Sequence, residues 1–201
     1  MSLSNESDEV REEEEKVADQ DVQGFKRLYT LKEQIAKGGF SVVFTASPVS
    51  DEEKTYAVKV IDRKKVKDKD VQSVFREVEI MKELREMPNV ITVVDFFDEP
   101  EYLYIVQSYA SGGNLFYRLT QRKQYTEKCA RDIAVVLFQT LDDIHTKYSI
   151  VHRDLKPDNL LLEDLVTEKI YLADFGFARH ITEEGLKTRC GTPAFVVSIS
   201  A

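Results

Sequence analysis

Cysteine is scarce in this sequence, and long apolar runs and an N-terminal acylation signal are missing. The 201 residues contain two cysteines, Cys129 and Cys190, too few for the disulfide framework of a small secreted domain. No apolar stretch is long enough to span a bilayer or to form the core of a signal peptide. Residue 2 is Ser2 rather than the glycine that N-myristoylation requires. These absences predict a reduced, soluble, intracellular protein, in the cytoplasm or alternatively in the nucleus.

Charge is distributed unevenly along the chain. Residues 1 to 24 hold nine acidic side chains and two basic ones, so they carry -7 of the net charge of -8. With almost no apolar residues, this segment cannot bury enough surface to offset its ordering entropy. We expect a disordered, solvated acidic tail over residues 1–24, with an acidic docking motif as the alternative. The charged run from Asp62 to Asp70 is expected to be a solvated loop, with a nuclear import signal as the alternative.

The densest group of chemically useful side chains lies between Ile150 and Gly176. Asp154 is followed by Lys156 and Asn159, and Asp174 comes after an apolar run. Carboxylate and amide oxygens are the ligands that hard cations such as Mg²⁺ prefer. A further carboxylate can accept the proton of a hydroxyl group, and a lysine can hold a phosphoryl group. The stretch therefore predicts phosphoryl transfer.

The first half of the chain alternates apolar and polar residues from Leu28 onward, as strands do. Strands are expected over Tyr29 to Ala36, Val42 to Ala46, Thr55 to Ile61, Asn89 to Phe97 and Tyr102 to Tyr109, and a helix over Val71 to Met87. A second helix is expected after Thr126, a suitable N-cap. Its apolar face should form a core, with Ala130, Ile133, Ala134, Leu137, Leu141 and Ile144.

Lys59 stands at a strand position that solvated surface explains poorly, because it shares a face with Ala57 and Ile61. Glu77 falls on or beside the inward face of the expected helix, and a buried carboxylate needs a cation. We expect Lys59 and Glu77 to pair. The alternative is that Lys59 snorkels at a sheet edge.

The strings HRDLKPDN and DFG, which begin at His152 and Asp174, resemble the catalytic and metal-binding loops of protein kinases. The resemblance covers Leu28 to Val196. It is greatest to the serine/threonine kinases of the calcium/calmodulin-dependent group, and Lys156 is typical of serine/threonine rather than tyrosine kinases. It implies an α+β, bilobal fold with a small antiparallel-sheet N-lobe, an αC helix and an incomplete, mainly helical C-lobe.

The resemblance also implies residue roles in ATP- and magnesium-dependent transfer to proteins. The implied catalytic residues are Asp154, Lys156, Lys59 and Glu77, and the implied metal ligands are Asn159 and Asp174. The implied nucleotide-binding residues are Ala36, Gly38, Gly39, Phe40, Ser41, Val43, Ala57, Lys59, Gln107, Ser108, Ala110, Asn114 and Leu161. Met81, Val93, His152 and Phe175 are expected to stack between the lobes.

The nucleotide loop departs from the family pattern. Ala36 and Ser41 stand in place of its first and third glycines, and Gly38 remains where the backbone must approach phosphates. Gln107 is expected at the gatekeeper position. Asn114 replaces a glutamate common in the group.

The last residues resemble an activation segment. Thr188 lies where an activating phosphate is expected, opposite Arg153, and Thr192 matches the threonine that contacts the catalytic aspartate and lysine. The expected organisation is a tail over 1–24, an N-lobe and hinge over 25–110, part of a C-lobe over 111–196, and residues 197–201 outside the family pattern.

Because the family's next motif and later helices do not follow, we expect a kinase truncated within its activation segment, with weak or absent transfer by this chain. The alternative function is a catalytically incompetent nucleotide-binding or interaction fragment of a kinase. A protein substrate is the expected partner. Nucleic acid, membrane and calmodulin are not expected as partners, because no segment supports them.

Overall fold

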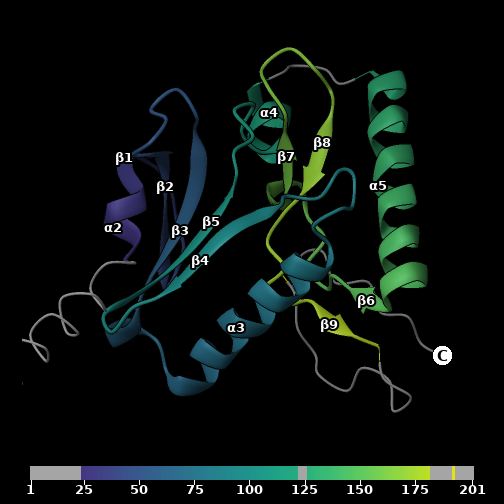
Figure 1. Cartoon of the computed structure of the whole chain (residues 1–201). Coiled ribbons are helices and arrows are strands. Elements are labelled where there is room, and N and C mark those ends of the chain that lie inside the picture. Colours follow the sequence, from purple (N-terminus) through teal and green to yellow (C-terminus); the bar gives the residue numbers. More distant parts are fainter. Residues whose placement is uncertain (1–23, 122–125, 182–191, 193–201) are drawn as a thin grey trace, which may run out of the picture.

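The computed structural model describes residues 24–121, 126–181 and 192. Its N-terminal part is a five-stranded antiparallel sheet with one long helix, and its C-terminal part combines helices with short strand pairs (Figure 1). The sheet has the order β1-β2-β3-β5-β4, with β1 Tyr29–Lys37, β2 Ser41–Pro48, β3 Tyr56–Asp62, β4 Val93–Asp98 and β5 Tyr102–Ser108. The long helix α3 spans Asp68–Glu83 between β3 and β4.

Both faces of the sheet are covered, and this is why β5 is an almost continuous apolar run. Leu103 and Ile105 face a core shared with α3, whereas Tyr104 and Val106 belong to a separate outer cluster. A short helix, α2 Phe25–Leu28, closes the outer cluster, and its Phe25 ring stacks on Tyr104 with centroids 4.2 Å apart. The sequence pattern had not indicated this helix.

The C-terminal part is built around a long helix and a β-hairpin. Its elements are α4 Leu115–Gln121, α5 Glu127–Tyr148, β6 Ile150–Val151, η3 Pro157–Asn159, β7 Leu160–Leu162, β8 Ile170–Leu172 and β9 Arg179–His180. Strand β7 pairs with β8, and β6 pairs with β9. Thr126 caps α5 as expected, because its side chain accepts a hydrogen bond from the Cys129 amide. None of the helices in the described ranges combines the length and hydropathy needed to cross a bilayer.

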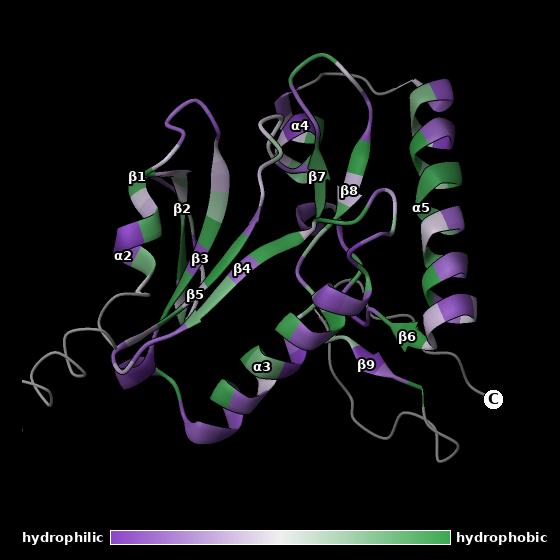
Figure 2. Cartoon of the chain, in the orientation of Figure 1, coloured by the Kyte–Doolittle hydropathy of each residue, from purple (hydrophilic) through white to green (hydrophobic). Residues whose placement is uncertain are grey.

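The expected face of α5 is only partly correct. Ile133, Leu141 and Ile144 are buried, but Ala130 is exposed, because it lies in the first turn, beyond the reach of the packed core. Apolar residues recur along the whole of α5 (Figure 2), and Phe138 is 67% exposed.

Two elements, α3 and β4, differ most from their expected bounds. Helix α3 begins three residues earlier and ends four residues earlier than expected. Strand β4 begins at Val93 rather than Asn89. Asn89 has a left-handed φ of 59°, and residues 89–91 bond to the second part of the molecule instead: Leu172 N donates to Asn89 O (2.8 Å) and Ile91 N donates to Leu172 O (2.9 Å). This segment joins α3 to the hairpin that precedes Asp174.

Candidate active site

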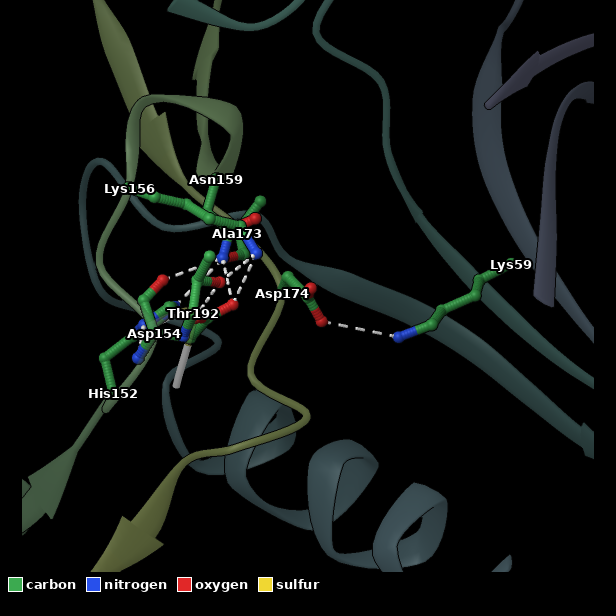
Figure 3. A network of polar contacts seen from close by, with 8 residues as sticks. All are labelled: Lys59, His152, Asp154, Lys156, Asn159, Ala173, Asp174 and Thr192. Atoms are coloured by element: carbon green, nitrogen blue, oxygen red, sulfur yellow. Dashed lines mark hydrogen bonds and ion pairs between the residues drawn. The ribbon is translucent and has the colours of Figure 1, made fainter. Parts of the chain in front are cut away.

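Lys59 and Glu77 form a buried ion pair between the sheet and α3. Lys59 Nζ lies 2.7 Å from Glu77 Oε1, and the Glu77 side chain is only 5% exposed. Asp174 Oδ1 lies 3.5 Å from the same Nζ (Figure 3). Burial lowers the pKa of Lys59, but the two carboxylates outweigh burial and raise it, so the ammonium group stays charged. The structure thus brings together three of the sequence-predicted residues from β3, α3 and the segment after β8.

Asp154 is the centre of a second polar network (Figure 3). Its Oδ1 accepts hydrogen bonds from Thr192 N (2.8 Å) and Thr192 Oγ1 (2.7 Å). Its Oδ2 accepts from Lys156 Nζ (2.7 Å) and Asn159 Nδ2 (3.1 Å). Burial raises the pKa of Asp154, but the hydrogen bonds from Lys156 and Thr192 outweigh burial, and the pKa is held below its usual range. Asp154 is therefore a carboxylate at neutral pH, with all four contacts made by donors.

The backbone before Asp154 is fixed by buried groups. His152 is 1% exposed and its ring meets Phe175 edge to face, with centroids 4.9 Å apart. His152 Nε2 donates to Ala173 O (2.9 Å), and Nδ1 accepts from Asp154 N (3.3 Å). Met81 and Val93 are buried in the same core as Phe175, as the expected stack requires. The Asp154 loop is thus joined through His152 to the segment that carries Asp174.

Asn159 and Asp174 lie at the open ends of the β7–β8 hairpin. Ala173 N donates to Asn159 O (2.9 Å), so the hairpin pairing continues to the residue before Asp174. The Asn159 amide nitrogen also donates to Asp154 O (2.8 Å), which leaves the amide oxygen for a cation. Asp174 has a left-handed φ of 62°, and its side chain is 44% exposed. This set of hard oxygen donors fits Mg²⁺, which keeps water and phosphate ligands.

The residues expected to surround a nucleotide come from β1, β2 and the turn between them, from β3, from the end of β5 and the segment after it, and from β7. Gly38 N donates to Ser41 O (2.8 Å), which closes the β1–β2 turn, and Phe40 is 60% exposed at its tip. In the sheet, Val43 pairs with Ala36 and Lys59, and Ala57 pairs with Gln107. Apart from its two chain neighbours, no described residue has an atom within 4 Å of a Cβ built on Gly39.

The chain leaves the sheet through a segment that contacts β7. Ser108 N donates to Thr92 O (2.9 Å), Ala110 is buried, and Asn114 forms an antiparallel bridge with Leu161. Asn114 Oδ1 accepts from Tyr117 N (2.7 Å), so this side chain caps α4.

Comparison with known proteins agrees with this geometry. A family model described as the protein kinase domain matches residues 29–198. The chain belongs to the protein kinase family. A probable myosin light chain kinase from Dictyostelium discoideum is 38% identical over 169 residues, which are 84% of this kinase chain and 52% of the relative. Calcium/calmodulin-dependent protein kinase type 1 from Caenorhabditis elegans is 35% identical over 172 residues, which are 85% of this chain and 49% of the relative.

A human relative gives a similar result. Human ribosomal protein S6 kinase alpha-6 is 36% identical over 176 residues, 86% of this chain and 23% of the relative. The chain spans about half the length of most of the curated relatives it matches. The bilobal kinase fold is therefore confirmed for the part present.

The predicted phosphorylation site of this kinase, Thr188, lies outside the described residues. Arg153, its expected partner, has a left-handed φ of 67° and donates from Nε to Phe177 O (2.8 Å). Thr192 is described, and it contacts both Asp154 and Lys156 as expected. Arg118, whose side chain donates to Asp164 O, was not singled out from the sequence.

His152 should make the stability of this kinase depend on pH. Burial lowers its pKa below the ordinary 6.5, so the unfolded chain takes up a proton that the folded chain does not. The contribution of neutral His152 to the free energy of unfolding is fully present above about pH 6.5. It is lost as the pH falls below that value, at no more than about 1.4 kcal/mol per pH unit. Urea unfolding between pH 5 and 8 should therefore show a shallower acid slope in His152→Gln, whose amide can still donate to Ala173 O.

The exposed His145 supplies the matched control. His145→Gln should keep the acid slope of the wild type. If the acid slope of His152→Gln equalled that of the wild type, His152 would not be the source of the pH dependence.

Proposed function

We propose that this kinase domain transfers the terminal phosphoryl group of ATP, with Mg²⁺, to serine or threonine hydroxyls of proteins. The observation that carries the proposal is the convergence of two charged clusters from distant parts of the chain. One contains Lys59, Glu77 and Asp174, and the other contains Asp154, Lys156 and Asn159. Phosphoryl transfer depends mainly on positioning and on neutralising phosphate charge, and these clusters supply both.

Asp154 is proposed to receive the proton of the attacking hydroxyl. It is ionised, and its four donors hold it in one orientation. As the hydroxyl oxygen bonds to phosphorus, the bond from phosphorus to the leaving ADP oxygen breaks and the hydroxyl proton passes to the carboxylate. Lys156, 2.7 Å from Asp154, is placed to balance charge on the moving phosphoryl group.

Lys59 is proposed to hold the non-reacting phosphates. Its ammonium group is fixed by Glu77 and remains charged. The amide oxygen of Asn159 and the carboxylate of Asp174 would hold Mg²⁺, which neutralises phosphate charge when bound.

The sheet and the segment after it are proposed to enclose the base and the phosphates. Backbone of the turn at Gly38 and Gly39 would cover the phosphates, with Phe40 at the tip. Ala36 and Ser41 would stand at the first and third glycine positions of this loop. The apolar side chains of Val43, Ala57 and Leu161 would contact adenine, and the backbone of Ser108 and Ala110 would hydrogen-bond it. Gln107 and Asn114 would border the same site.

Serine and threonine are the proposed acceptors for two reasons. Lys156 stands where serine/threonine kinases carry a lysine. The named relatives are myosin light chain kinases and calcium/calmodulin-dependent kinases.

Magnesium and ATP together should stabilise this chain. Because ligand binding adds RT ln(1 + [L]/Kd), a hundredfold excess over Kd gives about 2.7 kcal/mol. Thermal melting with MgATP should therefore show a rise of several degrees that EDTA removes. Labelled phosphate should then pass from ATP to peptides with serine or threonine, and not to matched peptides with tyrosine or alanine. Absence of both stabilisation and transfer would overturn the proposal. Binding without transfer would overturn its catalytic part and would favour the alternative, a catalytically incompetent nucleotide-binding fragment of a kinase.

A further inference from the structure

Arg118 is a buried cation that none of the proposed catalytic steps uses. It lies on α4 and is 7% exposed. Its NH2 group donates to Asp164 O (2.7 Å), across 46 positions of sequence. Helix α4 lies beside β7 and the β7–β8 connection (Figure 1), so this bond fastens the helix to the turn of the hairpin.

The segment that leaves the sheet is held by the same turn. Ser111 N donates to Glu163 O (3.0 Å), and Gly112 N donates to Leu162 O (3.0 Å). Gly112 packs so closely that a Cβ there would lie 2.1 Å from Asp164 O. The carbonyl oxygen of Asp164 therefore accepts a hydrogen bond from Arg118 and packs against the backbone at Gly112.

The turn itself is closed by hydrogen bonds to the Asp164 side chain. Asp164 Oδ1 accepts hydrogen bonds from Thr167 N (2.6 Å) and Val166 N (2.7 Å). These two bonds are the main reason that the pKa of Asp164 is low, and the nearby charge of Arg118 lowers it further. These two bonds hold Asp164 against the residues that follow it in the turn.

The opposite end of this hairpin carries both proposed metal ligands. Asn159 precedes β7 directly, and Asp174 follows β8 after one residue. Leu161, a proposed adenine contact, lies in β7 between the two ends. The β7–β8 hairpin thus joins Leu161, the proposed adenine contact, to Asn159 and Asp174, the proposed metal ligands. Fixing the hairpin at its turn would fix their relative positions.

We infer that Arg118 is a positioning residue for the nucleotide site: it clamps the Asp164 turn against residues 111–112, and so holds Asn159 and Asp174 in register with the adenine-binding segment. The inference rests on the proposed function, since it assumes that a nucleotide binds there. Arg118 acts through the hairpin and touches no reacting atom. Loss of the clamp should weaken ATP binding more than it slows transfer.

Substitutions at the two residues beside the Asp164 carbonyl, Arg118 and Gly112, test this inference. Arg118→Met removes the donor and keeps much of the apolar stem, and Gly112→Ala pushes the carbonyl away. Each should raise the KM for ATP about tenfold while kcat changes less than threefold, and the double variant should be little worse than either single one. Arg118→Lys, which keeps the charge and a single donor, should lie between wild type and Arg118→Met. Lys169→Met is the control, because Lys169 pairs with Glu163 on the hairpin surface, and it should leave the KM unchanged.

Hydrogen exchange separates failure of this inference from failure of the proposed function. The amides of Ser111 and Gly112 should be protected in the wild type and exchange at least tenfold faster in Arg118→Met, with Arg118→Lys between the two, whether or not ATP is present. If the wild type does not bind MgATP, the proposed function fails. The exchange rates of Ser111 and Gly112 would still show whether Arg118 holds the Asp164 turn against these residues. Unchanged exchange at both amides, or an unchanged KM in variants that bind ATP, would overturn the inference.

Discussion

Replacing Asp154 with asparagine is expected to reduce phosphoryl transfer by at least a hundredfold, because an amide cannot accept the hydroxyl proton and general-base catalysis contributes 10²–10⁴-fold. The substitution preserves shape but not hydrogen bonding. Both carboxylate oxygens accept from donors, so the new amide NH2 must face either Thr192 or Lys156 and lose one set of bonds. MgATP affinity should change less than threefold, since Lys59 is untouched.

The control for this variant is the same chemical change in the same loop. Asp158 is exposed in η3, and Asp158→Asn should keep transfer within about twofold of wild type. Rates are measured as labelled phosphate passed to a serine-containing peptide, and affinity is measured by calorimetry. If Asp154→Asn kept more than a tenth of the wild-type rate at saturating ATP, Asp154 would not be the base.

Much of the sheet and of the site follows from local pattern. The alternation in β3 placed Lys59 on the inward face, and helical spacing placed Glu77 opposite it; the structure joins them at 2.7 Å. The Asp154 and Asp174 loops could be placed because the strings that contain them resemble the catalytic and metal-binding loops of protein kinases. The Lys59–Glu77 pair follows from the strand and helix periods of the sequence, and each of the two loops is a short continuous segment.

What the pattern could not give depends on distant partners. Phe25 lies in a four-residue helix that is too short to be stable alone, and it is held by stacking on Tyr104. Asn89 looked like the start of a strand, but its segment bonds to Leu172. A charged residue on a helix is most often at the surface, so Arg118 gave no signal without Asp164 beside it.

The largest expected effect on stability belongs to the buried ion pair. Lys59→Met leaves the Glu77 carboxylate, 5% exposed, without its cation. Removing one partner of a buried pair typically costs about 3–5 kcal/mol. MgATP affinity should also fall more than tenfold, because the ammonium group proposed to hold the phosphates is gone. Asp174 loses the same neighbour but is 44% exposed, so water replaces much of that interaction.

The two effects of Lys59→Met should separate in the variant Lys59→Met/Glu77→Gln. Neutralising Glu77 removes the uncompensated charge, so most of the lost unfolding free energy should return, measured by urea denaturation at pH 7. MgATP affinity should stay low, because no cation replaces Lys59. Lys64→Met supplies the control, since Lys64 pairs with Glu101 at the surface and its loss should barely move the urea midpoint. Wild-type stability in Lys59→Met would show that Glu77 carries no uncompensated buried charge. Recovery of nucleotide affinity in the double variant would show that Lys59 does not bind phosphate.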